Sequence, residues 1–327
     1  MPMLRPAREV SFAAALAIGL GLASGAAAQN YPAKPIRLIV PFAPGGPADV
    51  IGRIIGQQLN VILGQSIVVE NRGGAGGTIG ARLAAMADPD GYTLMFANTS
   101  TMSINPAVYR HLDYNPAKAF APVALIGTTS NILVVNPALP VKTLAELITY
   151  GKANPGRLSY STPGVGTPPH MIGEMFKQRT GLDITHVPYK GGGSSTQDVV
   201  SGQVSMTFEN PAVSLPLVLA GQIRALAVTS GVRNPRIPDV PTLSETIPDF
   251  VSASFTGIVA PAGVSGAVIA RLNAAINESL KAPSVQATLD KLSVEVKPGT
   301  PEEFGAFLAT EREKWQTVAM RAKIQVD

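Results

Sequence analysis

Short runs of β-branched residues alternate along the chain with segments whose apolar residues recur at helical spacing. The run IRLIV at residues 36–40 predicts a buried strand, and the prolines and glycines that follow end it. Residues 48–63 then carry apolar side chains at helical spacing, among them Ile51, Ile55 and Leu59. The same pattern predicts a strand at 66–70, a helix at 78–87 and a strand at 92–97.

This alternation continues to the end of the chain. A threonine followed three residues later by a glutamate, at Thr143 and again at Thr300, is typical of a helix start. We expect further strands at 132–135, 158–161, 184–188, 204–208, 226–229 and 254–259, and further helices at 143–154, 169–180, 195–201, 265–281 and from Thr300. Strands that alternate with helices predict an α/β fold with mostly parallel sheets, each covered by helices on both faces.

The chain is long enough for two domains, with 327 residues. No Ser/Gly tract and no run of charges separates one half from the other. We therefore expect two α/β lobes between which the chain crosses more than once. Such crossings form a hinge and leave a cleft between the lobes.

The composition narrows the class of protein. With 46% hydrophobic and 15% charged residues, the chain is too apolar to be disordered. The net charge of +4 is interspersed and lacks a basic stripe with aromatic residues, so we expect no nucleic-acid partner. The chain has no Cys, which excludes disulfides, thiolate metal sites and a cysteine nucleophile.

The N-terminus has the layout of a secretory signal peptide. Arg5 and Arg8 precede an apolar run at 11–23, and three alanines at 26–28 form a small-residue cleavage pattern. A membrane anchor is the alternative, but the run is shorter than the ~20 apolar residues that a spanning helix needs. We expect residues 1–28 to be removed and the mature protein to be soluble in the periplasm.

Catalytic motifs are missing from the sequence. There is no G-x-S-x-G, no H-E-x-x-H and no Walker loop, and the three histidines, His111, His170 and His186, lack metal-ligand spacing. The Gly-rich stretch at 73–80 departs from the dinucleotide pattern, because Ile79 stands where the third glycine should be. We expect no catalytic residue, no cofactor and no metal.

Two strand-to-helix loops do suggest chemistry. Residues 44–49 and 162–167 both combine glycines with a helix start. Glycine allows a ligand close to the backbone, and the free N–H groups of a helix start attract anions. Two such loops facing one another across a cleft predict a site for a small carboxylate.

Short motifs in a fixed order carry a family resemblance over essentially the whole mature chain. The motifs are Tyr31-Pro-x-Lys34, Val40-Pro-Phe-Ala-Pro-Gly-Gly46, Glu70-Asn-Arg72, Asp90-Gly-Tyr-Thr-Leu94, Gly164-x-Gly-Thr167, Val187-Pro-Tyr-Lys-Gly191, Pro238-Asp-Val-Pro-Thr242 and Gly299-Thr-Pro-Glu-Glu-Phe304. With these motifs the chain resembles the Bug family of periplasmic solute-binding proteins, the TctC-like receptors of tripartite tricarboxylate transporters.

The resemblance implies a two-lobed Venus-flytrap fold, with one lobe formed by 29–128 and 254–327 and the other by 129–253. It implies capture of a small carboxylate, whether a di- or tricarboxylate, an amino acid or an aromatic acid, by a monomer that docks transiently on an inner-membrane permease. The implied ligand-binding residues are Phe42, Ala43, Pro44, Gly45, Gly46, Ala48, Asp49, Asn98, Thr99 and Ser100 in lobe one, and Thr162, Gly164, Val165, Gly166, Thr167, His170, Glu209 and Asn210 in lobe two.

Several alternatives stay open at this point. Asp49 either caps its helix or contacts the ligand, His170 is either packed or a ligand contact, and Glu209 lies either at the pocket floor or at the hinge. Phe255 replaces a Trp that is frequent in the family. A sensor that docks on a kinase would need the same cleft as a transport receptor, and a periplasmic α/β enzyme is the remaining alternative.

Overall fold

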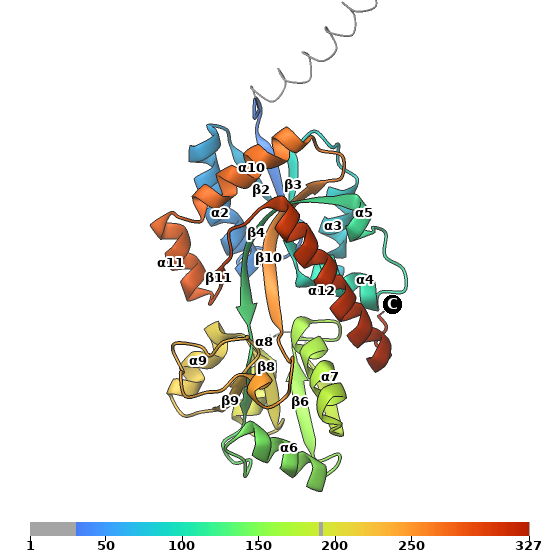
Figure 1. Ribbon diagram of the computed structural model, residues 1–327, viewed down its shortest axis with the longest axis vertical. Coiled ribbons are helices and arrows are strands. Elements are labelled where there is room, and N and C mark those ends of the chain that lie inside the picture. The colour runs from blue at the N-terminus through green and yellow to red at the C-terminus, as the bar shows by residue number, and fades with distance from the viewer. Residues whose placement is uncertain (1–30, 190–191, 327) are drawn as a thin grey trace, which may run out of the picture.

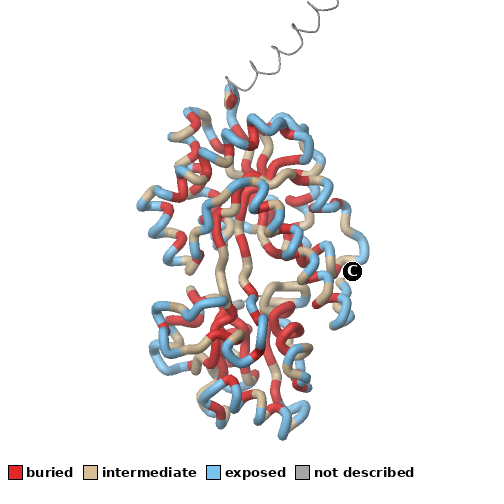
Figure 2. The backbone as a smooth tube through the Cα atoms, in the orientation of Figure 1, coloured by how far each residue is buried: buried red, intermediate tan, exposed pale blue. Residues whose placement is uncertain are grey.

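Two sheets organise the chain, one in each of two lobes that meet at a narrow waist (Figure 1). The computed structural model describes residues 31–189 and 192–326, so the expected signal segment lies outside the described residues. Buried backbone is concentrated in the centre of each lobe (Figure 2). In the described part of the chain, no helix has both the length and the apolar composition to cross a bilayer.

The six-stranded sheet of the first lobe has the strand order β11-β4-β10-β3-β1-β2. Its strands are β1 (Ile36–Val40), β2 (Ile67–Asn71), β3 (Thr93–Asn98), β4 (Phe120–Ser130), β10 (Ala253–Pro261) and β11 (Glu295–Val296). Its helices are α2 (Pro47–Leu63), α3 (Thr78–Ala85), α4 (Asn105–Val108), α5 (Pro116–Ala119), α10 (Gly266–Ser279), α11 (Pro283–Lys291) and α12 (Pro301–Ala322), with a 3-10 turn at Ala75–Gly77 and a π-helical turn at Ser100–Ile104.

The five-stranded sheet of the second lobe has the order β7-β6-β8-β5-β9. Its strands are β5 (Ile132–Val135), β6 (Leu158–Thr162), β7 (Ile184–Pro188), β8 (Met206–Glu209) and β9 (Arg224–Val228). The helices of this lobe are α6 (Leu144–Ala153), α7 (Pro168–Thr180), α8 (Gly192–Val200) and α9 (Pro211–Leu219), with a 3-10 turn at Leu243–Glu245.

Both sheets are buried on both faces, as the continuous apolar runs predicted. Leu38 and Phe96 pack in one core with α2 and α10, while the neighbouring Ile39 and Met95 pack in another with α3 and α12. Alternate side chains of a strand point to opposite faces, so a strand covered on both sides needs apolar residues at every position.

The strand directions differ from the prediction of mostly parallel sheets. Both sheets are mixed, with four parallel pairings and five antiparallel ones. A strand that is buried on both faces has the same apolar pattern whichever way it runs, so the pattern could not distinguish the two directions.

Strands β4 and β10 lead from one lobe to the other (Figure 1). They pair antiparallel along their length, from Phe120 opposite Pro261 to Ser130 opposite Ala253. Just beyond this pair, Thr229 Oγ1 accepts a hydrogen bond from Asn131 N at 2.8 Å and donates one to the carbonyl of Ser252 at 2.6 Å. One buried hydroxyl therefore joins the two crossing segments at the waist.

Helix α12 forms a further connection between the lobes. Its first turn has the capping box predicted at Thr300 and Glu303. Its later residues Trp315 and Val318 belong to the same apolar cluster as Tyr160 and Phe176 of the second lobe. Gln178 Nε2 of α7 also donates to the carbonyl of Val318 at 3.1 Å.

Truncation of Trp315 tests this connection. Because Trp315 is fully buried, Trp315→Ala should lower the free energy of unfolding by about 3–5 kcal/mol, the usual cost of removing a large buried aromatic side chain. Met320→Ala is the matched control on the same helix, since Met320 is 69% exposed, and it should change stability by less than about 0.5 kcal/mol. Urea unfolding followed by circular dichroism measures both, and equal effects of the two variants would contradict this packing role.

Candidate functional site

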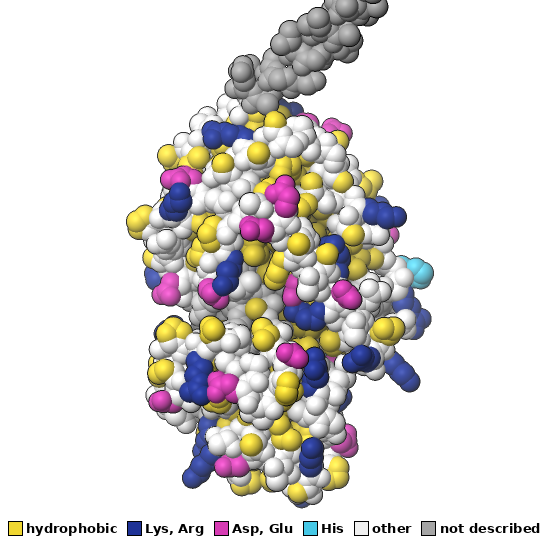
Figure 3. Space-filling view, viewed as in Figure 1, with side chains coloured by type: hydrophobic (Ala, Val, Ile, Leu, Met, Phe, Trp, Pro, Cys, Tyr) yellow, Lys and Arg dark blue, Asp and Glu magenta, His cyan; other side chains and the backbone are white. Residues whose placement is uncertain are grey.

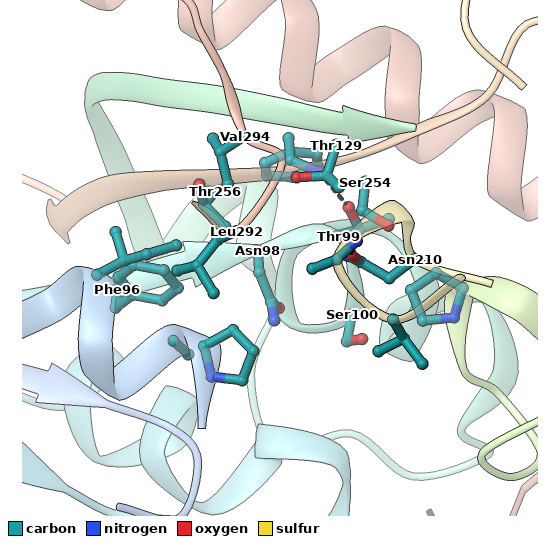
Figure 4. A pocket seen from close by; sticks show the side chains of 17 residues that line it. Phe96, Asn98, Thr99, Ser100, Thr129, Asn210, Ser254, Thr256, Leu292 and Val294 are labelled. Atoms are coloured by element: carbon teal, nitrogen blue, oxygen red, sulfur yellow. Dashed lines mark hydrogen bonds between the residues drawn. The ribbon is translucent and has the colours of Figure 1, made fainter. Parts of the chain in front are cut away.

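A cleft of about 390 Å³ lies between the lobes at the waist (Figure 4). The first lobe contributes residues from α2, β3, β10 and the approach to β11, and the second contributes α9 and the start of α7. The lining residues are Pro47, Ala48, Ile51, Phe96, Asn98, Thr99, Ser100, Thr129, Pro168, Asn210, Ala212, Val213, Ser254, Phe255, Thr256, Leu292 and Val294. Five of the expected ligand residues are among them: Ala48, Asn98, Thr99, Ser100 and Asn210.

The end of β3 presents an amide group to this cleft. Asn98 Oδ1 accepts hydrogen bonds from Thr101 N at 3.0 Å and Thr101 Oγ1 at 3.2 Å, which orients the side chain. Asn98 Nδ2 has no protein partner among the described residues and points into the cleft (Figure 4). Ser100 follows in a π-helical turn, a feature frequent at functional sites.

Thr99 joins β3 to the strand that crosses between the lobes. Its Oγ1 accepts a hydrogen bond from Phe255 N at 2.8 Å. On that strand, Thr256 lies opposite Asn98 in the antiparallel register, and Thr256 Oγ1 is buried without a protein partner in the described chain. A buried hydroxyl without a partner is costly, so the Thr256 hydroxyl is a strained feature of the strand behind the cleft surface.

Helix α2 begins at the rim of the cleft. Gly46 is its N-cap residue, Pro47 takes the first helical position, and no side chain of the described residues caps this end. The first turn therefore leaves N–H groups without partners inside the helix, and the positive end of the helix dipole lies beside the cleft at Ala48.

Asp49 braces the loop before α2. Its Oδ2 accepts a hydrogen bond from Gly45 N at 2.9 Å, and its Oδ1 accepts from Asn71 Nδ2 and Arg53 Nε, both at 2.9 Å. Burial opposes ionisation, but the bonds from Arg53, Gly45 and Asn71 outweigh it and lower the pKa of Asp49. Asp49 does not line the cleft in this structure, and neither do Phe42, Ala43, Pro44, Gly45 and Gly46.

The loop at 162–167 satisfies most of its own polar groups. Gly164 N donates to Thr162 Oγ1 at 3.3 Å, Thr167 N donates to the Gly164 carbonyl at 3.4 Å, and Gly166 N donates to His170 Nδ1 at 3.1 Å. The next two residues are prolines and have no N–H. None of Thr162, Gly164, Val165, Gly166, Thr167 and His170 lines the cleft, whereas the adjacent Pro168 does.

Beneath this loop, two histidines stack on one another. The rings of His170 and His186 lie 4.0 Å apart between centroids, and His186 Nε2 is 2.7 Å from Thr162 Oγ1. The sequence spacing gave no sign of this pair, because the two rings meet only where α7, which carries His170, packs over the paired strands β6 and β7. Burial lowers the pKa of both imidazoles, and burial together with the neighbouring His170 lowers the pKa of His186 to about 4.

Glu209 and Asn210 lie at the end of β8. The Glu209 side chain is buried, its Oε1 accepts from Asn210 N at 2.7 Å, and its Oε2 accepts from the hydroxyl of Thr196. Burial raises the pKa of Glu209, despite these two hydrogen bonds. Asn210 reaches the cleft and caps α9, with its Oδ1 accepting from Ala212 N at 2.8 Å.

Sequence reasoning missed most of the remaining lining. Thr129, Ser254 and Thr256 lie on the crossing strands, while Leu292 and Val294 lie between α11 and β11. For Thr129, Ser254 and Thr256, the signal available in the sequence was a hydroxyl side chain near the end of segment 120–130 or near the start of segment 253–261. No charged side chain is among the lining residues, and the described residues contain no cluster of three potential metal ligands.

A family model described as the tripartite tricarboxylate transporter family receptor, TctC, matches residues 51–323. Protein BugT of Bordetella pertussis is 36% identical over 300 residues, which cover 91% of this chain and 92% of BugT. This chain belongs to the TctC family. It is a solute-binding receptor and not an enzyme, and the expected two-lobed α/β fold is confirmed.

Solved structures of similar proteins agree with this membership. A periplasmic transporter is 42% identical, with a TM-score of 0.77, and the match covers 91% of this receptor and 100% of that chain. An R. palustris protein with adipate is 35% identical, with a TM-score of 0.77 and coverage of 90% and 99%. MatC of Rhodopseudomonas palustris with bound malate is 32% identical, with a TM-score of 0.74 and coverage of 88% and 99%.

The stacked histidines make the stability of this receptor dependent on pH. Unfolded imidazole takes up a proton near pH 6.5, whereas folded His186 stays neutral down to about pH 4. Between these values the unfolded state binds more protons, so the free energy of unfolding should fall as the pH falls, by at most about 1.4 kcal/mol per pH unit for one group.

Urea unfolding between pH 7 and pH 4 measures this slope. His186→Gln should flatten it, and His111→Gln, at an exposed position, is the matched control that should leave it unchanged. The groups around the pair are Tyr160, Glu174 and Lys177. If the slope of the His186→Gln variant equals that of the unchanged receptor, the stacked pair does not account for the pH dependence.

Proposed function

We propose that this receptor captures a small organic carboxylate in the cleft and delivers it to a membrane permease of the tripartite tricarboxylate type. The single observation that carries the proposal is a cleft between two lobes whose polar lining groups are amides and hydroxyls, with no charged side chain among its lining residues. The family membership and the adipate and malate of its structural neighbours support the same class of ligand.

The polar groups of the cleft fit one carboxylate. Asn98 Nδ2 and the Ser100 hydroxyl are hydrogen-bond donors at the cleft without protein acceptors among the described residues. They lie beside the start of α2, whose dipole favours an anion. Hydrogen bonds to a charged acceptor are stronger than neutral ones, and burial in a closed cleft strengthens them further.

Closure requires two lobes that move about the waist. We propose that 29–128 with 254–327 forms one lobe and 129–253 the other, with the Thr229 hydroxyl at the hinge. The loops at 42–49 and 162–167, with His170 and Glu209, would then border the ligand in the closed state. We further propose that residues 1–28 direct export and are removed, and that the receptor acts as a monomer in the periplasm.

A thermal-shift screen of ligand-free receptor against carboxylates tests the proposal. A ligand at 100 times its Kd should stabilise the folded state by ~2.7 kcal/mol and raise the melting temperature. A sugar or a cation that raises the melting temperature while every carboxylate fails would contradict the proposed class of ligand.

Substitution of Asn98 tests the site itself. Asn98→Ala should weaken carboxylate binding by roughly 10-fold or more, because a hydrogen bond to a charged group contributes ~1.5–3 kcal/mol. Gln57→Ala removes an exposed amide of α2 outside the cleft and should leave the affinity unchanged. Isothermal titration calorimetry compares the two variants, and equal affinities of both would mean that the carboxylate binds at another part of the molecule.

A further inference from the structure

Three apolar lining residues of the first lobe gather on one side of the cleft (Figure 4). Phe96, Leu292 and Val294 lie together on one side, and Ser100 and Asn210 lie on the other. Asn98 stands between the two sides, and its cross-strand neighbour Thr256 lies with Leu292 and Val294. A ligand held at Asn98 therefore has polar groups on one side and an apolar wall on the other.

The apolar wall is part of the core of the first lobe. Ile51, Phe96 and Val294 belong to the apolar cluster that packs between the six-stranded sheet and α2, and Leu292 packs against that cluster. These side chains carry no polar atom and are held in place by packing, so they offer a ligand only apolar surface.

The second lobe adds an exposed apolar side chain to the cleft. Val213, on the first turn of α9, lines the cleft and is 45% exposed. Covering it removes apolar surface from water, which favours an apolar group of the ligand in this position.

The apolar wall disfavours polar substituents on the ligand. A hydroxyl or a second carboxylate placed against Phe96, Leu292 and Val294 would lose its hydrogen bonds to water without gaining protein partners. No lining residue supplies a positive charge for a further carboxylate. A hydrocarbon chain or ring suffers no such loss and gains burial.

We propose that the receptor is specific for acids whose carboxylate is attached to a hydrocarbon body, and that Leu292 and Val213 determine this specificity. The carboxylate binds at Asn98 and Ser100, and the body packs against the apolar wall and, across the cleft, against Val213. Densely hydroxylated acids and tricarboxylates are rejected. This inference rests on the proposed function, because it requires a carboxylate in the cleft.

Two pairs of matched acids test the inference on the full receptor by calorimetry. Hexanoate should bind roughly 10- to 15-fold more tightly than butyrate, because each buried methylene contributes about fourfold. Hexanoate should also bind at least about fivefold more tightly than 6-hydroxyhexanoate, whose far hydroxyl would face the apolar wall. Adipate, malate and citrate form the third arm of the comparison.

Substitutions then locate the specificity. Val213→Ser and Leu292→Ser should each reduce the hexanoate-to-butyrate ratio to about threefold or less, because each removes apolar surface from the cleft. The ratio cancels general losses of binding, and the exposure of Val213 makes its substitution safe for folding. Val61→Ser is the control, since Val61 is 78% exposed on α2 and lies outside the cleft, and it should leave the ratio unchanged.

The outcomes separate this inference from the proposed function. If no acid of any arm binds, the proposed function fails. If acids bind but hexanoate and butyrate bind equally, or citrate or malate binds more tightly than hexanoate, the proposed function stands and this inference is wrong. A ratio that is unchanged in both cleft variants would also overturn the role of Leu292 and Val213.

Discussion

The antiparallel pairing of β4 with β10 is the interaction on which the rest of the structure depends. These strands complete the six-stranded sheet and then lead into the second lobe. Thr129, Ser254 and Thr256 reach the cleft only because they lie on these strands at the waist. Beyond the pairing, Thr229 Oγ1 bridges Asn131 and Ser252, so the same ladder that joins the lobes also positions the polar groups between them.

The cleft separates binding groups from bracing groups. Asp49, Glu209 and His170 are ionisable residues close in sequence to the cleft, and in this structure each holds a loop or helix start by hydrogen bonds. The groups that line the cleft are neutral. The ionisable residues therefore hold the loops in place, while the surface of the cleft is neutral. Its amides and hydroxyls need no counter-charge when the ligand is absent.

Local sequence patterns predicted the regular elements well. The capping box at Thr300 and Glu303 is confirmed, whereas at Thr143 only half of it forms, because the Glu146 carboxylate accepts from Lys142 N at 2.6 Å. The longest strand, β4, was missed. It contains Pro122, at a register shift, and Gly127, where a Cβ would lie 2.3 Å from the Glu295 carbonyl of β11. Proline and glycine ordinarily mark the end of a strand in a sequence. Here Pro122 lies at an irregularity of the strand pairing, and Gly127 leaves room for β11.

The site was predictable only in part, for a related reason. Asn98, Thr99 and Ser100 lie at the end of one strand, and a motif could mark them together. Leu292 and Val294 reach the cleft because the segment after α11 returns to the edge of the first sheet. The stacking of His170 on His186 likewise follows from the packing of α7 against β7. Contacts between distant segments leave no periodic signal in the sequence.

A cleft without charged side chains has a consequence for the medium in which the receptor works. Dissolved ions screen interactions between net charges over about 8–10 Å at physiological salt, but they affect short hydrogen bonds to amides and hydroxyls far less. Because the lining residues offer hydrogen bonds and no ion pair, ionic strength acts on the direct contacts with an anion mainly through the dipole of α2. Steering of an anion toward the cleft depends instead on the charge of the whole protein, which is +4 and is screened by dissolved salt. Salt therefore acts on the approach of an anion more than on its contacts.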